Sequence, residues 1–177
     1  MAYESARNAL VFDWNMIRGF LLEEIRSLHE AVLRRFLVNT ITSMTGELRG
    51  IGALQVENVL RVVHGDITAH SVQRKVRICR EGSLLIFHRM QKEPHYIHRI
   101  DAEGDFYIPE IGNTIRIMST GAALDNAVLR CWQPGDRMFG RRIAEVLSTM
   151  KVPRSLRMFW PVLVSNGIVL AVAETQE

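Results

Sequence analysis

Seven basic side chains gather between residues 130 and 160, near the C-terminal end of the sequence. Only two carboxylates, Asp136 and Glu145, lie in the same stretch, which therefore carries a formal charge of +5. Six of the seven cations are arginines, and a guanidinium forks onto phosphate with two hydrogen bonds. The stretch predicts either a surface that binds a polyanion or a solvated face with incidental arginines. Its cations are Arg130, Arg137, Arg141, Arg142, Lys151, Arg154 and Arg157.

Motifs of catalysis are absent from the sequence. It contains no Gly-x-x-x-x-Gly-Lys loop and no Gly-x-Ser-x-Gly turn. His29-Glu30 begins like a zinc-binding helix, but Leu33 occupies the position of the second histidine. Residues 101–105 begin like a calcium loop, but Gly112 stands where a bidentate Glu is needed, so a turn is predicted there. We therefore predict no catalytic residue, no metal ligand and no cofactor bound by this chain.

Three histidines, His88, His95 and His98, lie within eleven residues of one another. On a strand, residues 95 and 98 point to opposite faces, and no cysteine or carboxylate stands at a ligand spacing. We expect sheet histidines here rather than a metal site. Contact with RNA, by stacking or by donation to phosphate, is their functional alternative.

Composition places the chain among ordinary globular proteins of one or two domains. Of 177 residues, 47% are hydrophobic and 23% are charged, and arginines make up 19 of the 22 cations. Two distant cysteines, Cys79 and Cys131, predict no disulfide and fit a reducing compartment. The N-terminus shows no secretory signal, and the most apolar stretch is shorter than the ~20 residues of a membrane helix. A cytoplasmic location without membrane contact is expected.

The first half of the sequence predicts helices followed by a hairpin. Ser27 and Glu30 form a capping box for a helix that Gly46 ends, and Gly65 ends a second helix over residues 53–64. The spacing of Trp14, Ile17, Phe20, Leu21 and Ile25 predicts a further helix before Ser27, whose start the sequence does not fix. The period then changes to two, and strands are predicted at 71–79 and 84–88 around a turn at Gly82.

The second half predicts short strands and one helix. Apolar residues on one face predict the helix over 141–150, and Asn166-Gly167 predicts a hairpin that closes the chain. The whole is predicted to be an α+β protein, with a helical domain at residues 1–92 and a small strand-rich domain at 93–177. The strands of the second domain are expected at 96–100, 106–108, 114–118, 127–131, 161–164 and 168–172.

The order of residues in the basic stretch resembles a known family. Leu-Arg-Cys-Trp-Gln-Pro-Gly-Asp-Arg at 129–137 is followed by a basic pair, by Lys-Val-Pro-Arg-Ser-Leu-Arg at 151–157 and by Trp-Pro-Val-Leu at 160–163. This order resembles the C-terminal domain of tRNA(Ile)-lysidine synthetase. The helix at 28–37, the segment 56–60 and the hairpin after Gly65 look like that family's central domain. Between Arg137 and the basic pair the family usually has a longer loop than residues 138–140.

The resemblance implies a tRNA-binding function without the catalytic step. Family members carry an ATP-pyrophosphatase domain with a Ser-Gly-Gly-x-Asp-Ser loop, which adenylates the wobble cytidine so that lysine displaces AMP. This sequence has no such loop, so ATP and lysine are implied only for the missing catalytic domain. The chain is expected to come from a truncated or split synthetase gene or to work with a separately encoded ATP-pyrophosphatase partner. The chain would hold tRNA for that partner, and a homodimer is left open. The seven cations named above are the expected tRNA contacts.

The turn residues of the same motif have expected roles of their own. Pro134, Gly135 and Pro153 are predicted to fix the geometry of two bends. Asp136 is expected to orient a neighbouring arginine or to cap a turn.

Two other functions stay open. The first is a protein-interaction or editing-type domain that resembles part of the β subunit of phenylalanyl-tRNA synthetase. The second is a small-molecule enzyme that uses the histidines.

Overall fold

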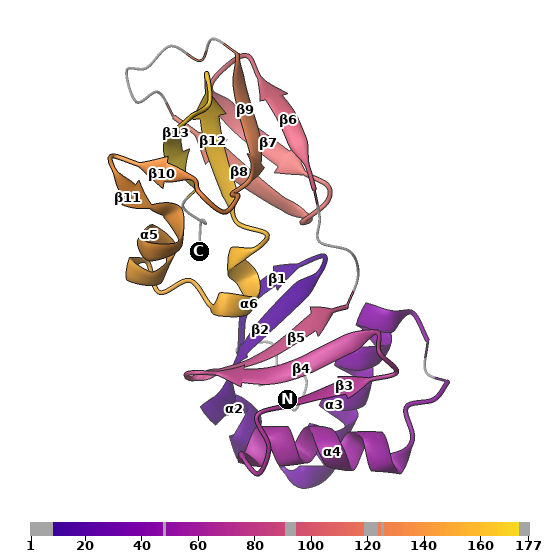
Figure 1. The fold of residues 1–177 in the computed structure, drawn as a ribbon. Helices are drawn as coiled ribbons and strands as arrows, with labels where there is room; N and C mark the ends of the chain where they lie inside the picture. Colours follow the sequence, from indigo (N-terminus) through magenta and orange to yellow (C-terminus); the bar gives the residue numbers. More distant parts are fainter. Residues whose placement is uncertain (1–8, 48, 91–94, 119–123, 125, 174–177) are drawn as a thin grey trace. The chain divides into compact units, whose positions relative to one another are not determined.

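A computed structural model of the chain describes residues 9–47, 49–90, 95–118, 124 and 126–173. Helices and antiparallel sheets are both present, which confirms the α+β class. Two compact units divide the chain, residues 1–91 and residues 92–177, so the division falls one residue from the expected boundary (Figure 1). No helix in the described ranges is long and apolar enough to cross a bilayer.

Unit 1, residues 1–91, is built on a five-stranded antiparallel sheet. The strand order is β1-β2-β5-β4-β3, and each strand pairs with a neighbour in antiparallel register. The sheet gives this unit far more strand than the expected helical domain with one hairpin. Its strands are β1 (Leu10–Trp14), β2 (Ile17–Leu21), β3 (Ala69–Val72), β4 (Val76–Glu81) and β5 (Leu84–Arg89).

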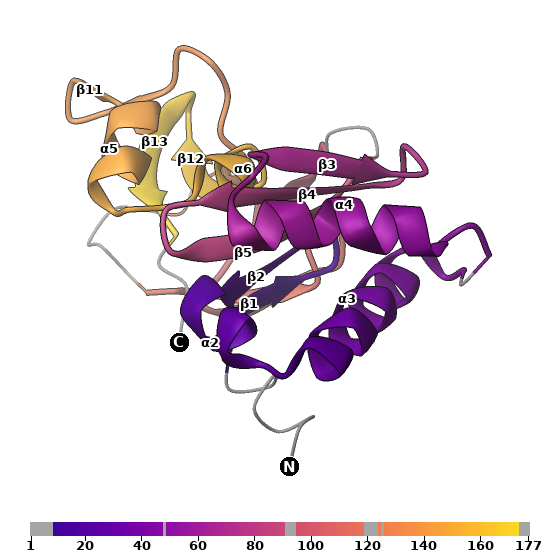
Figure 2. The same ribbon diagram turned by 90° about the horizontal axis from the view of Figure 1, so that it is seen from below.

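Three helices cover one face of this sheet: α2 (Leu22–Ser27), α3 (Glu30–Thr45) and α4 (Ala53–His64). In Figure 2, α4 runs alongside β3 and β4. Phe20, Phe36 and Phe87 meet edge to face in the core between the helices and the strands. The predicted helix stops are confirmed, because Gly46 and Gly65 end α3 and α4 in the left-handed conformation, with φ of 75° and 100°.

The helix predicted before Ser27 is confirmed only for residues Leu22–Ser27 (α2), because the apolar residues Ile17 and Phe20 lie on a strand instead. Residues Ile17–Leu21 form β2, which pairs with β1 and β5, and the sequence Ile-Arg-Gly-Phe-Leu lacks the strict apolar–polar alternation that marks a strand. The capping box at Ser27 is wrong. Ser27 is the last residue of α2 and donates its hydroxyl to the Glu24 carbonyl, whereas His29 caps α3 by accepting the amide of Ala31.

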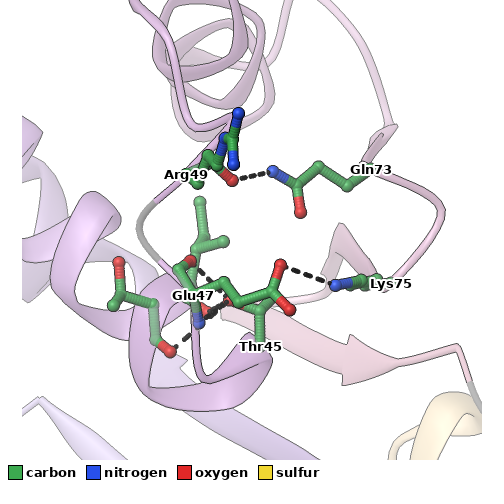
Figure 3. Close-up of polar contacts among 7 residues, drawn as sticks. Thr45, Glu47, Arg49, Gln73 and Lys75 are labelled. Atoms are coloured by element: carbon green, nitrogen blue, oxygen red, sulfur yellow. Dashed lines mark hydrogen bonds and ion pairs between the residues drawn. The ribbon is translucent and has the colours of Figure 1, made fainter.

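The strand predicted over 71–79 is interrupted by a tight turn. Gln73 and Arg74, with φ of 54° and 57°, join β3 to β4, and neither is a residue type that announces a left-handed turn. Figure 3 shows this turn fastened to the loop after α3. Gln73 Nε2 donates to the Arg49 carbonyl at 2.6 Å, and Lys75 Nζ lies 2.9 Å from a Glu47 carboxylate oxygen.

Unit 2, residues 92–177, holds the motif that carries the family resemblance. Its main sheet has four antiparallel strands in the order β13-β12-β9-β6, and β7 pairs with β8 in a separate ribbon. All six predicted strands are confirmed within one or two residues. They are β6 (Ile97–Ile100), β7 (Gly104–Ile108), β8 (Asn113–Ile117), β9 (Ala127–Cys131), β12 (Pro161–Ser165) and β13 (Ile168–Val172).

Two consecutive residues before β12 hold both ends of unit 2. The buried hydroxyl of Tyr96, which precedes β6, donates to the Phe159 carbonyl at 2.9 Å. The buried indole of Trp160 donates to the carbonyl of Ala173, which follows β13, at 2.8 Å. The strand that these residues lead into, β12, is buried along its whole length.

The basic stretch forms a ribbon and two short helices. Arg137–Met138 (β10) pairs with Arg141–Arg142 (β11), α5 spans Ile143–Thr149, and α6 spans Arg154–Arg157. The helix predicted over 141–150 is therefore shorter, because its first two residues pair with β10 instead. The two-residue strands and α6 have no counterpart in the prediction, and β10 lies against β13.

Candidate functional site

Two arginines face each other across the β10–β11 ribbon. Arg137 and Arg142 are direct register partners, and both are exposed. Like charges opposite each other on paired strands are unfavourable. Within the described residues neither guanidinium has a carboxylate partner, and Arg137 Nη1 donates only to the Gly140 carbonyl at 2.8 Å. The pair is thus a site of concentrated positive charge that an anion would stabilise.

A proline-glycine turn forms the floor beside this pair. The Asp136 amide donates to the Gln133 carbonyl at 3.0 Å, with Pro134 and Gly135 between them and Gly135 at φ 100°. Proline in the first central position and glycine at positive φ in the second are the signature of a type II turn. The predicted structural role of Pro134 and Gly135 is confirmed.

Arg130 forms an ion pair inside the protein rather than presenting its charge to solvent. Its Nη1 and Nη2 lie 2.8 and 2.9 Å from the two carboxylate oxygens of Asp136, and the two side chains are 13% and 14% exposed. The Gln133 amide also donates to Asp136 at 2.7 Å. Asp136 therefore orients an arginine and caps the turn, as predicted. Arg130, expected as a tRNA contact, is mostly covered and paired with this carboxylate.

The environment of Asp136 fixes its charge state. Burial raises the pKa of this carboxyl, but the hydrogen bonds from Arg130 and from the Gln133 amide outweigh burial, so the pKa lies below its usual value. Asp136 is ionised at neutral pH, and Arg130 neutralises it. The local excess of charge is therefore the Arg137–Arg142 pair.

Trp132 contributes an aromatic ring beside this turn, and a hydrogen bond to α6 holds the ring in place. Its indole N–H donates to the Arg157 carbonyl at 2.6 Å, and the ring is half-buried. Arg157 in turn donates from Nε to the Val152 carbonyl at 2.9 Å, and Pro153 caps α6 from the preceding position. Arg157 therefore uses one of its N–H groups inside the protein. The predicted role of Pro153 in fixing the backbone at this bend is confirmed.

These parts enclose a pocket of about 400 Å³ in unit 2. The size lies within the roughly 300–1,000 Å³ of pockets that hold small ligands. Its lining combines an aromatic ring and a proline with two arginines, a composition suited to a ligand with a flat apolar part and an anionic part. The lining residues are Trp132, Pro134, Gly135, Asp136, Arg137, Arg142 and Ala144.

The other predicted contacts lie on the elements around the pocket but do not line it. Arg141, next to Arg142 on β11, reaches Thr149 of α5 at 3.2 Å. Lys151 follows α5 with φ of 58°, and Arg154 opens α6. All three are exposed, and none forms an ion pair with another described residue. The structure thus brings Arg137 and Arg142 together and leaves Arg141, Lys151 and Arg154 available on the surface nearby.

The three histidines divide between the two units, His88 in unit 1 and His95 and His98 in unit 2. His98 Nε2 lies 2.9 Å from a Glu110 carboxylate oxygen, and the ring stacks on Tyr96 with centroids 5.9 Å apart. His88 lies on β5 of unit 1, where burial first and then the charge of Arg77 lower its pKa. No group of three potential metal ligands occurs among the described residues.

Sequence reasoning assigned no role to two aromatic residues of this region. Trp132 was part of the recognised motif, and its position next to a Pro-Gly turn is the signal that could have marked it as a wall. Phe139 lies between the two ribbon strands, is 92% exposed and has φ of 50°. The sequence does show an aromatic residue between the basic residues at 137 and 141–142. Its exposure is known only from the structure.

Comparison with models of known protein families and with curated proteins found no match.

Proposed function

We propose that this chain is a tRNA-binding module that resembles the central and C-terminal domains of tRNA(Ile)-lysidine synthetase. Unit 1 corresponds in this proposal to the substrate-binding-like domain, and unit 2 to the C-terminal domain. One observation carries the proposal: the exposed cations around α5 and α6 have no carboxylate partners among the described residues, while Arg130, the seventh cation, is neutralised inside the fold.

The chemistry of RNA stems agrees with this surface. An A-form helix has a deep and narrow major groove, so proteins hold it through its phosphates, its 2′-hydroxyl groups and its shape. Exposed arginines without internal partners are suited to phosphate, because they need not break an ion pair before they bind. We infer that Arg137, Arg141, Arg142, Lys151 and Arg154 make these contacts.

The catalytic step lies outside this chain in the proposal. An ATP-pyrophosphatase domain outside these 177 residues would supply ATP-dependent transfer of lysine to the wobble cytidine, while this chain holds tRNA(Ile) in the cytoplasm. The two modules would meet only on the same tRNA or through direct contact. This division predicts tRNA binding by the isolated chain without ATP hydrolysis.

The salt dependence of binding tests the proposal. Five phosphates neutralised on a duplex stem give a slope of log affinity against log salt of about −4.5. Replacing Arg141 and Arg154 together by alanine should bring the slope closer to zero by about 2. The measurement is fluorescence anisotropy of a labelled tRNA(Ile) transcript, titrated with the full chain at several salt concentrations.

A matched control variant is available within the same unit. Arg99 and Arg116 are exposed arginines that pair with Asp101 and Asp105. Their double replacement by alanine removes the same number of arginines and should leave the slope unchanged. Affinity that does not depend on salt, or equal slopes for the two double variants, would refute the proposal. Capture of a protein partner after ribonuclease treatment, with no tRNA retained, would favour the protein-interaction function instead.

A further inference from the structure

We propose that the pocket beside the β10–β11 ribbon holds a single unpaired nucleotide of an RNA strand. Its base would lie against Trp132 and Pro134, and its phosphate between Arg137 and Arg142. The inference rests on the proposed function, and it adds a defined subsite for unpaired RNA to a surface otherwise suited to a stem.

The charge balance of the pocket favours a phosphate. Arg137 and Arg142 are opposite each other, so their mutual repulsion is relieved when one anion binds both. Asp136 also lines the pocket and would repel that anion, but the bidentate contact with Arg130 at 2.8 and 2.9 Å neutralises it. Arg130 is therefore a positioning residue for the site, although it makes no contact with the ligand.

The apolar part of the lining, Trp132 and Pro134, favours a base. Trp132 is fixed by its 2.6 Å hydrogen bond to the Arg157 carbonyl, and Pro134 is fixed by the type II turn. A fixed aromatic face needs no reordering when a ring stacks on it, and every base has such a face. Stacking on one aromatic residue strengthens binding of single strands by about tenfold or more.

The shape of the site favours an unpaired nucleotide over a duplex. The pocket of about 400 Å³ is concave and can receive a single base. In a duplex, paired bases expose only their edges in the grooves, and the backbone phosphates lie on a convex surface. A bare phosphate would use the arginines and leave the apolar wall empty. A nucleotide uses both.

Trp132 also offers a direct reading of occupancy. The other two tryptophans, Trp14 and Trp160, are only 3% and 4% exposed, so Trp132 is the ring that a bound base can reach. A stacked base quenches indole fluorescence. Trp132→Phe removes this signal while it keeps an aromatic face, and Trp132→Leu removes the face as well.

The experiment titrates the full chain with four probes: a blunt RNA hairpin, the same hairpin with four unpaired nucleotides at its 3′ end, the same extension at the 5′ end, and adenosine monophosphate alone. We expect one of the extended hairpins to bind about tenfold tighter than the blunt hairpin and to quench the fluorescence. Trp132→Leu should abolish the tenfold preference and leave binding of the blunt hairpin within twofold. Arg137→Gln with Arg142→Gln should weaken binding of every hairpin, as the proposed stem contacts require, and should also abolish the preference, which covers the case in which Trp132→Leu fails to fold.

The outcomes separate this inference from the proposed function. Salt-dependent binding of all three hairpins with equal affinity, without quenching, would overturn the nucleotide site and leave the tRNA-binding proposal standing. Adenosine monophosphate that binds as tightly as the extended hairpins would overturn the strand-borne ligand in favour of a free nucleotide. Absence of any RNA binding would overturn both.

Discussion

Replacing Arg130 by methionine should destabilise unit 2, because it leaves the Asp136 carboxylate nearly buried without its counter-charge. Breaking a buried ion pair by removing one partner costs about 3–5 kcal/mol. The Arg130–Asp136 pair retains 13% and 14% exposure, and the Gln133 amide still serves the carboxylate at 2.7 Å. The lower end, about 3 kcal/mol, is therefore expected. In a unit of this size that loss lowers the midpoint of thermal unfolding by roughly 12 °C or more.

The assay is urea unfolding at pH 7, followed by tryptophan fluorescence. Adding Asp136→Asn to Arg130→Met should recover part of the loss, since an amide oxygen still accepts the Gln133 amide and no charge remains buried. Arg116→Met is the matched control. Arg116 also forms a bidentate pair, with Asp105 at 2.6 and 2.9 Å, but its side chain is 52% exposed, so little change is expected.

The pH dependence of the same variant gives an independent check. The pKa of Asp136 lies below its usual value in the folded state, so the stability contributed by the ion pair is complete above about pH 4 and is lost as the pH falls further. The difference between the wild-type chain and Arg130→Met should therefore shrink toward pH 3. A destabilisation no larger than that of Arg116→Met, or effects of Arg130→Met and Asp136→Asn that simply add, would refute the reasoning.

Three further outcomes are expected. Phe139→Asn should raise the free energy of unfolding by about 1 kcal/mol, measured in urea, because asparagine accepts the left-handed conformation at far lower cost. The free energy of unfolding should fall as the pH drops below about 6.5, because burial lowers the pKa of His70 and His88 and the unfolded chain takes up protons first. The fall should be smaller in the His70→Gln, His88→Gln double variant, and a flat profile of the wild-type chain would contradict this. Gly46→Ala should lower the free energy of unfolding by about 1 kcal/mol, and Gly65→Ala should lower it more. An added Cβ meets open space at residue 46 and the guanidinium of Arg80 at residue 65, so equal losses would count against the steric contact.

Local signals predicted much of the fold. Gly46 and Gly65 stop their helices because glycine accepts the left-handed conformation, and Asn166-Gly167 closes a hairpin for the same reason. These signals act within a few residues, so a single sequence contains them in full. The same holds for the Pro134-Gly135 turn.

Long-range pairing decided the features that the sequence could not predict. Residues Ile17–Leu21 have helical spacing and become a strand because β5, more than sixty residues later, pairs with them. Arg141 and Arg142 leave the predicted helix because β10 pairs with them. Neither pairing leaves a local trace.

The candidate site follows the same division. The sequence predicted which cations are concentrated near the C-terminus, but it did not distinguish Arg130, which is used internally, from Arg137 and Arg142, which line the pocket. That distinction depends on the turn at 133–136, which places Asp136 within reach of one arginine only. Charge counts along the chain cannot resolve it.

The hydrogen bonds from Tyr96 to Phe159 and from Trp160 to Ala173 hold the two ends of the described part of unit 2 against the same chain segment. Its first and last segments are fastened to adjacent residues of one chain segment, so a short linker between residues 173 and 96 would replace an existing proximity. New termini could then be opened at Asn166-Gly167, the exposed turn between β12 and β13, without removing any strand. A circular permutant of this kind would retain the arginine ribbon and its pocket while the chain enters and leaves the domain at another edge of the sheet.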